Sequence, residues 1–219
     1  MGTNSITELD TSQWFLILSN IVFLLPASLA SRRNEIIRAL GFTAVAGVSA
    51  MYHFCADTTV CGERAIYREL DHVLAVWLIV TITLLFSSWH REIEYLVEVI
   101  ALGGIACLIL LYTGTENDTH NLIIAITIPT GVFLLVVIPS WSVHGVPPGL
   151  RIFMGRVIVG LCIIGVGIAF FFARIVPNQN YNHGLWHIAV ALGAAVLITG
   201  LRDSHLRNID HYSALRRTT

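Results

Sequence analysis

The sequence predicts an all-α membrane protein, a bundle of seven transmembrane helices with an extracellular N-terminus and a cytoplasmic C-terminus. Hydrophobic residues make up 55% of the chain, charged residues only 12%, and the mean hydropathy is +0.74, whereas a soluble domain has about a quarter charged residues. Several apolar runs approach the roughly 20 residues that a helix needs to cross a bilayer. Most arginines lie on one side of the bundle that these runs would form.

The apolar runs predict the individual helices. The first is not preceded by a basic stretch and its arginines follow it, so we interpret it as a helix of the mature protein and not as a secretory signal. The fifth contains Pro129 and ends near Pro139, which predict a kink or an end of that helix. The predicted helices in chain order are 13–30, 38–56, 67–88, 95–114, 121–140, 151–173 and 183–201.

The chain organisation follows from these helices. Residues 1–12 form a short extracellular N-terminus, residues 13–201 form the membrane domain, and residues 202–219 form a cytoplasmic tail. This orientation depends on ten of the thirteen arginines, which fall on one side and mark it as cytoplasmic. They are Arg32, Arg33, Arg38, Arg91, Arg151, Arg156, Arg202, Arg207, Arg216 and Arg217.

Two predicted outer loops agree with this orientation. Asn117 begins a glycosylation sequon between the fourth and fifth helices. Cys55 and Cys61 lie between the second and third helices, on the side where disulfides persist. We favour a disulfide between them, while two free thiols or a cysteine metal ligand are the alternatives.

Histidines and one carboxylate at the outer helix ends predict a metal site. His53 lies near the outer end of the second helix, Asp71 near the start of the third, and His183 and His187 at the start of the seventh. Residues four apart share a helix face, so His183 and His187 can bind one ion. Zinc accepts three imidazole nitrogens and a fourth ligand. We therefore predict zinc bound by the three histidines.

Two further residues have predicted roles at this site. Asp71 is interpreted as a ligand, as a hydrogen-bond acceptor from a ligand ring or as a general base. Ser49, one helical turn from His53, would donate a hydrogen bond to a developing oxyanion or bond only to its own helix backbone. The absence of lysine excludes a retinal Schiff base and a lysine nucleophile.

The pattern of Ser49 and His53, Asp71, and His183 and His187 resembles the seven-helix superfamily of alkaline ceramidases, adiponectin and progestin receptors and related lipid hydrolases. The stretch from Tyr52 to Cys55, with Cys61 and the Leu70-Asp71 pair, looks most like the myomaker group and its larger GPI-processing relatives. The tail lacks the cysteine cluster that resembles a palmitoylation site in well-known members.

The resemblance implies two alternative functions. The first is a plasma-membrane protein that promotes cell-cell fusion of myoblasts, in which zinc is structural. The second is an intramembrane lipid amidase or esterase in which zinc polarises the carbonyl, so whether the chain is an enzyme stays open. The expected partners are membrane lipids, an opposing cell membrane and a second copy of the chain in a homo-oligomer. We expect no nucleic-acid partner. Besides the plasma membrane, we expect the Golgi and the secretory pathway as further locations of the protein.

Overall fold

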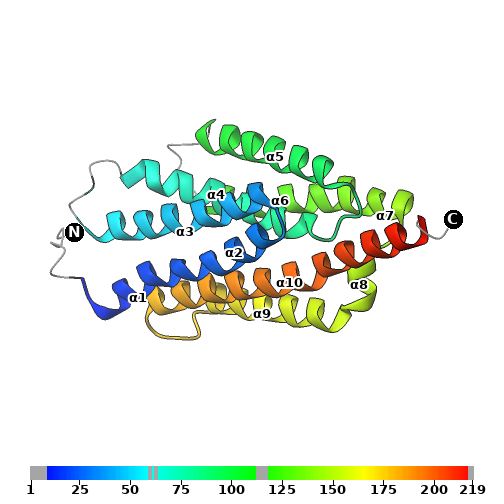
Figure 1. Ribbon diagram of the computed structural model, residues 1–219. Helices are drawn as coiled ribbons and strands as arrows, with labels where there is room; N and C mark the ends of the chain where they lie inside the picture. The colour runs from blue at the N-terminus through cyan, green and yellow to red at the C-terminus, as the bar shows by residue number, and fades with distance from the viewer. Residues whose placement is uncertain (1–8, 59–60, 62–63, 112–117, 217–219) are drawn as a thin grey trace.

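The computed structural model describes residues 9–58, 61, 64–111 and 118–216, and the regular elements among them are all helices (Figure 1). This confirms the predicted all-α class. Within these residues, five stretches are long and apolar enough to cross a membrane. They are Thr11–Arg32, Ile36–Ala56, Ile123–His144, Met154–Ala173 and Gln179–Leu201. The other two predicted spans correspond to α4 (Arg64–Leu84) and α5 (Arg91–Leu111), which are not among these five.

The first candidate membrane span, Thr11–Arg32, is not a regular helix throughout. It consists of α1 (Thr11–Ser19), the 3-10 turn η2 (Asn20–Phe23) and α2 (Leu24–Arg32). Pro26, the third residue of α2, has no backbone N–H with which to bond to the Val22 carbonyl in the preceding tighter turn. The prolines therefore account for breaks that hydrophobic periodicity alone does not reveal.

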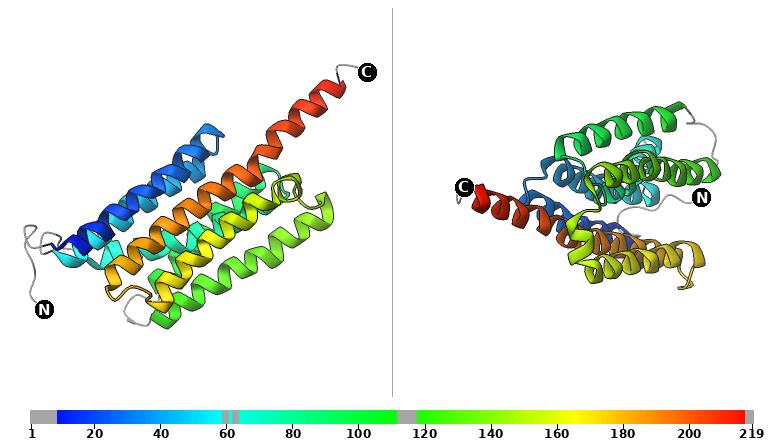
Figure 2. Two further views of the ribbon diagram at one scale, coloured as in Figure 1. Left: turned by 90° about the horizontal axis from the view of Figure 1, so that it is seen from below. Right: turned by 90° about the vertical axis from the view of Figure 1, so that its right-hand side faces the viewer.

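The remaining elements follow in antiparallel order. Helix α3 spans Ile36–Asp57. Helix α6 (Asp118–Val132) continues through the π-helical turn η3 (Phe133–Val137) into α7 (Ile138–His144), with a proline near the start of α7. The short α8 (Pro148–Ile152) leads to α9 (Met154–Ala173), and α10 spans Gln179–Arg216. Helix α10 thus continues through much of the predicted tail, and Figure 2 shows its last part extending beyond the bundle.

Helix α4 ends earlier than the predicted 67–88 span because the residues after it bond to another part of the chain. The Ser88 backbone N–H donates to Ser140 Oγ at 2.9 Å, and Ser88 Oγ donates to the Gly145 carbonyl at 2.6 Å. These bonds satisfy the backbone N–H and the hydroxyl of Ser88 without a further turn of helix. The α4–α5 connection is therefore attached to the end of α7.

Helix α4 joins the two hydrophobic clusters of the core. One cluster contains Leu78 and Leu85 together with buried residues of η2, α2, α3, α9 and α10. The other contains Trp77 and its neighbours on α4 with Ile105 of α5. Because α4 contributes buried side chains to both clusters, this helix connects the α5–α6 side of the bundle to α10.

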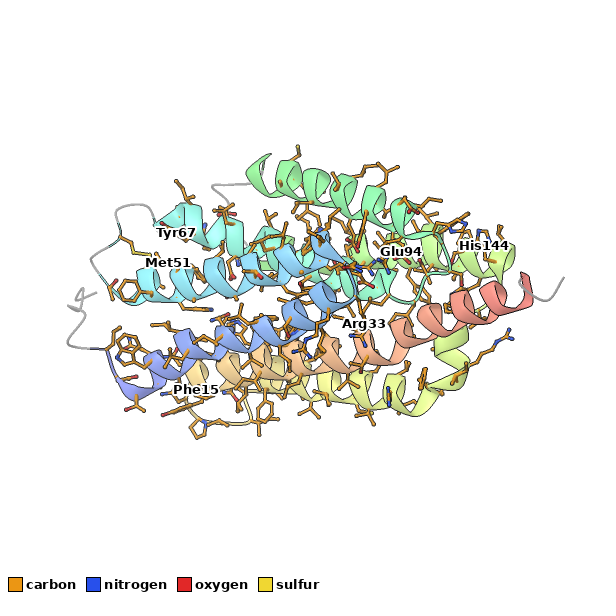
Figure 3. All side chains as sticks on the ribbon, viewed as in Figure 1. Phe15, Arg33, Met51, Tyr67, Glu94 and His144 are labelled. Atoms are coloured by element: carbon orange, nitrogen blue, oxygen red, sulfur yellow. A yellow bond between two sulfur atoms is a disulfide. The ribbon has the colours of Figure 1, made fainter. Side chains whose placement is uncertain are left out.

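Arg38 lies inside the bundle although its position in the sequence suggested a cytoplasmic flank. Its side chain is fully buried, as are the carboxylates of Glu35, Glu94 and Glu98, to which it donates at 2.9, 2.8 and 2.6 Å. Ser87 donates a further bond of 2.5 Å to Glu94. This Arg38 cluster joins α3 to α5. It lies toward the end of the bundle where Figure 3 labels Glu94 and Arg33.

Two glycines bring the α9 and α10 backbones into close contact. A Cβ on Gly193 would lie 2.4 Å from Ile164 Cγ1 and 2.8 Å from the Gly160 carbonyl oxygen. We expect Gly193→Ala to lower the free energy of unfolding by about 1–3 kcal/mol through overpacking, as measured by denaturant unfolding in detergent. The control is Gly165→Ala on α9, where a Cβ would meet no atom within 4 Å. A stability equal to that of the control would contradict this close packing.

Candidate metal centre

The structure brings His53, His183 and His187 together. One ligand nitrogen from each lies within 4.8 Å of the others. The ring centroids are 4.8 Å apart for His53 and His183, 5.3 Å for His53 and His187, and 4.6 Å for His183 and His187. His53 and His187 are buried and His183 is partly buried. These three imidazoles form an arrangement that could hold a metal ion.

The start of α10 places two of these histidines. His183 and His187 are four residues apart, so their rings project from one helix face. The preceding loop is closed by Asn182, which is fully buried and accepts a 2.9 Å bond from the Val176 N–H. Asn182 Nδ2 also donates to the Val176 carbonyl. The chain is therefore fixed at Asn182, directly before His183.

The end of α3 places the third histidine. His53 is followed two residues later by Cys55, which forms a disulfide with Cys61 and has a Cα–Cα distance of 5.3 Å to it. Thr58 Oγ1 donates to the Phe54 carbonyl at 2.9 Å and extends the hydrogen bonding past the last turn. The disulfide and this bond fix the last turns of α3, and with them the backbone that carries His53.

One buried nitrogen of the cluster has no hydrogen-bond partner among the residues that the structure describes. His53 Nε2 is buried and has no hydrogen bond within the described part of the chain. A buried polar atom without a partner is costly, and a metal ion would supply the missing interaction. Three histidines are also the ligand set of a zinc site with one open position. The residues therefore fit a metal ion such as zinc.

Ser49 and Asp71 form a second pair beside the histidines. Ser49 is buried one turn before His53, and its side chain lies close to the carboxylate of Asp71 on α4. Among the described residues, the group of ligand atoms that lie within 4.8 Å of one another contains the three histidines and not Asp71. This placement favours Asp71 as a base or hydrogen-bond acceptor over Asp71 as a ligand.

Ser19 is a residue of this site that the sequence motifs did not predict. This α1 residue is buried, and its Oγ lies 3.2 Å from Nδ1 of His187, 168 positions away in the chain. Its signal in the sequence is weak because a serine in an apolar helix ordinarily bonds to its own backbone. The proposed glycosylation residue, Asn117, lies outside the described residues.

Comparison with known proteins identifies transmembrane relatives. The chain is similar to transmembrane protein 8B of Homo sapiens, Bos taurus and Mus musculus. Each of these relatives is 24% identical to this chain over 205 residues, which cover 85% of this chain. The match covers 40% of each relative, so the chain spans about two fifths of the length of these curated relatives. Together with the apolar helices, these matches show a membrane protein.

The family match corrects the assignment made from the motifs. The family described as "Protein of unknown function (DUF3522)" matches residues 11–188, which is most of the chain. The assignment to myomaker, within the superfamily of ceramidases and adiponectin and progestin receptors, was therefore wrong. The motifs misled because histidines four residues apart share a helix face in any helical protein, so a few such positions do not distinguish families. The chain belongs to the DUF3522 family.

Proposed function

We propose that the protein is a zinc-dependent intramembrane hydrolase that cleaves an ester or amide bond of a membrane lipid. The observation that supports this function best is the convergence of three imidazoles beside Ser49 and the Asp71 carboxylate. Structural metal sites need only their ligands, whereas hydrolytic sites also need a base close to the metal. Asp71 is such a base, and Ser49 fixes its position.

The proposal includes seven membrane crossings with an outer N-terminus. Helices α4 and α5 are each 21 residues long, which is enough to span a bilayer. Packing of α4 against α3, α5 and α6 supports placing it across the membrane as well. The arginine distribution supports placing the metal centre near the extracellular face of the plasma membrane or the lumenal face of the secretory pathway.

The chemistry divides among the residues of the site. His53, His183 and His187 would hold the metal, and zinc when bound would supply a Lewis acid that polarises the carbonyl and acidifies water. Asp71 would take a proton from the attacking water and later return it to the leaving group. The Ser49 hydroxyl, which lies close to the Asp71 carboxylate, would orient the base. Burial of Ser49 and His53 keeps bulk water from this part of the site.

Apolar side chains next to the site support a lipid as substrate. Met51, two residues before His53, is 41% exposed, and Leu70, next to Asp71, is 43% exposed. Ile66, one turn earlier on α4, is 53% exposed. Exposed apolar residues on membrane helices face acyl chains without cost. A lipid alongside α3 and α4 would therefore lie next to the polar residues of the site.

The test combines metal content with lipid cleavage. We expect the purified full chain to contain about one zinc per molecule and to release fatty acid from fluorescent phosphatidylcholine or ceramide in mixed micelles. His53→Ala should lower zinc retention and the rate at least about 100-fold, since it removes one of three ligands. The matched control is His144→Ala, because His144 is exposed on α7 at the other end of the bundle.

Two outcomes would count against the hydrolase. Zinc content equal in the wild type and in His53→Ala would show that the histidines do not bind the metal. Zinc that depends on His53, combined with intact lipids and with fusion of cells expressing the chain, would instead favour a structural metal in a fusion protein. Fluorescence exchange between differently labelled cells measures that alternative.

A further inference from the structure

Helix α1 packs along the first turns of α10. Ser12, Phe15 and Ser19 of α1 recur at the spacing of one helix face. Asn180 Nδ2 donates to Ser12 Oγ at 3.1 Å, and the rings of Phe15 and Tyr181 are 5.2 Å apart. These contacts align α1 with the segment of α10 that carries His183 and His187. The first crossing is thus a neighbour of the metal centre, although none of the proposed ligands belongs to it.

Gly184 allows the two helices to approach closely at this level. A Cβ on Gly184 would lie 2.5 Å from Phe15 Cε1 and 3.3 Å from Ser19 Oγ. Any larger residue would therefore push α1 away from α10. Gly184 lies three residues before His187, on the same face of α10. The close approach at Gly184 is what brings Ser19 within reach of the His187 ring.

The hydrogen bonds of Ser19 indicate which ring nitrogen of His187 carries the proton. A serine hydroxyl has one proton, and Ser19 Oγ donates it to the Leu16 carbonyl at 2.6 Å. The same oxygen lies 3.2 Å from His187 Nδ1. With its proton already donated, Ser19 Oγ accepts a hydrogen bond from Nδ1–H. His187 therefore holds its proton on Nδ1, a tautomer assigned from the hydrogen-bond network.

We propose that Ser19 is a positioning residue that fixes His187 with Nδ1 protonated and Nε2 free to bind the metal. This inference rests on the metal site of the proposed function. A ligating histidine usually donates its second ring N–H to an oxygen, which sets both the tautomer and the ring orientation. Both Ser19 and His187 are about 5% exposed, so water competes little for the Nδ1–H. The first membrane helix thereby becomes part of the metal site.

The experiment compares two variants of equal shape. Ser19→Thr keeps the hydroxyl and Ser19→Val removes it, while both side chains have a branched Cβ. We expect Ser19→Thr to keep the wild-type affinity for Zn²⁺ and Co²⁺ within about threefold, and Ser19→Val to bind each ion about 10–100-fold more weakly. Binding is measured with the full chain in detergent, by competition with a chelator for Zn²⁺ and by the visible absorption spectrum for Co²⁺.

Ser28→Ala is the matched control for loss of a helical serine. Ser28 Oγ donates to the Leu25 carbonyl at 2.8 Å, the same three-residue step that Ser19 makes, but Ser28 is exposed on α2. Its metal affinity should equal that of the wild type. Thermal unfolding of each metal-free variant separates loss of the fold from loss of the ligand orientation. If Ser19→Val does not fold, Ser19→Ala removes the hydroxyl without adding volume and should show the same weakening.

The outcomes distinguish this inference from the proposed function. A wild-type chain that binds neither ion would overturn the proposed metal site. A wild-type chain that binds Zn²⁺ tightly, with equal affinity in Ser19→Thr and in the folded hydroxyl-free variant, would overturn only the role of Ser19. An unchanged Co²⁺ spectrum in the hydroxyl-free variant would count against the inference in the same way, because a reoriented ring alters the ligand field.

Discussion

Arg38→Leu should destabilise the protein more than any other single change considered for this chain. Arg38 is fully buried and bonds to Glu35, Glu94 and Glu98, so its removal leaves three buried carboxylates without their cation. Removing one partner of a buried ion pair typically costs about 3–5 kcal/mol, and we expect a loss at the upper end of that range or beyond it. Denaturant unfolding in detergent, followed by tryptophan fluorescence, measures this loss.

A more exposed pair provides the control for Arg38. Arg68 donates to Glu69 at 2.9 Å, and their side chains are 34% and 16% exposed. Pairs of this kind contribute at most about 1 kcal/mol, so Arg68→Leu should change stability little. Combining Arg38→Leu with Glu94→Gln and Glu98→Gln should recover part of the loss, because fewer unpaired charges are then buried. Equal stability of the Arg38 and Arg68 variants would show that the Arg38 cluster does not stabilise the fold.

Arg38 also illustrates the limit of predicting orientation from a sequence. Arginines near helix ends usually lie at the membrane surface, and Arg38 follows Arg32 and Arg33 closely. Its burial depends on Glu94 and Glu98, which come from α5 more than fifty positions later. No local pattern indicates this partnership, since the carboxylates are visible as partners only after α3 and α5 have packed.

The histidine cluster was predictable for the opposite reason. The four-residue spacing of His183 and His187 places them on one helix face by local geometry alone. The depth of His53 follows from the alternation of helix directions, which hydrophobic run lengths already indicate. Ser19 has no such signal, because its contact with His187 depends on the close approach at Gly184. Ligands with regular spacing can therefore be found in a sequence, whereas the residues that orient them require the packed structure.

Asp71→Asn should reduce lipid hydrolysis while leaving metal binding intact. Asn keeps the shape of Asp71 and can still contact Ser49, but it cannot take a proton from water. General bases typically contribute about 10²–10⁴-fold to the rate, so kcat should fall by that factor with KM nearly unchanged. Release of fatty acid and zinc content, both measured on the same preparation, test this expectation.

Two comparisons decide what a lower rate in Asp71→Asn means. Glu69→Gln removes a negative charge two residues away on α4 and should leave both rate and zinc content unchanged, since Glu69 pairs with Arg68 and does not belong to the histidine cluster. Ser49→Ala should lower kcat less than Asp71→Asn does, because it removes only the group that orients the base. Loss of zinc in Asp71→Asn would instead make Asp71 a ligand, which its place outside the cluster of histidine nitrogens disfavours. A rate equal to that of the wild type would exclude Asp71 as the base. It would also exclude the proposed role of Ser49 in orienting that base beside the three histidines.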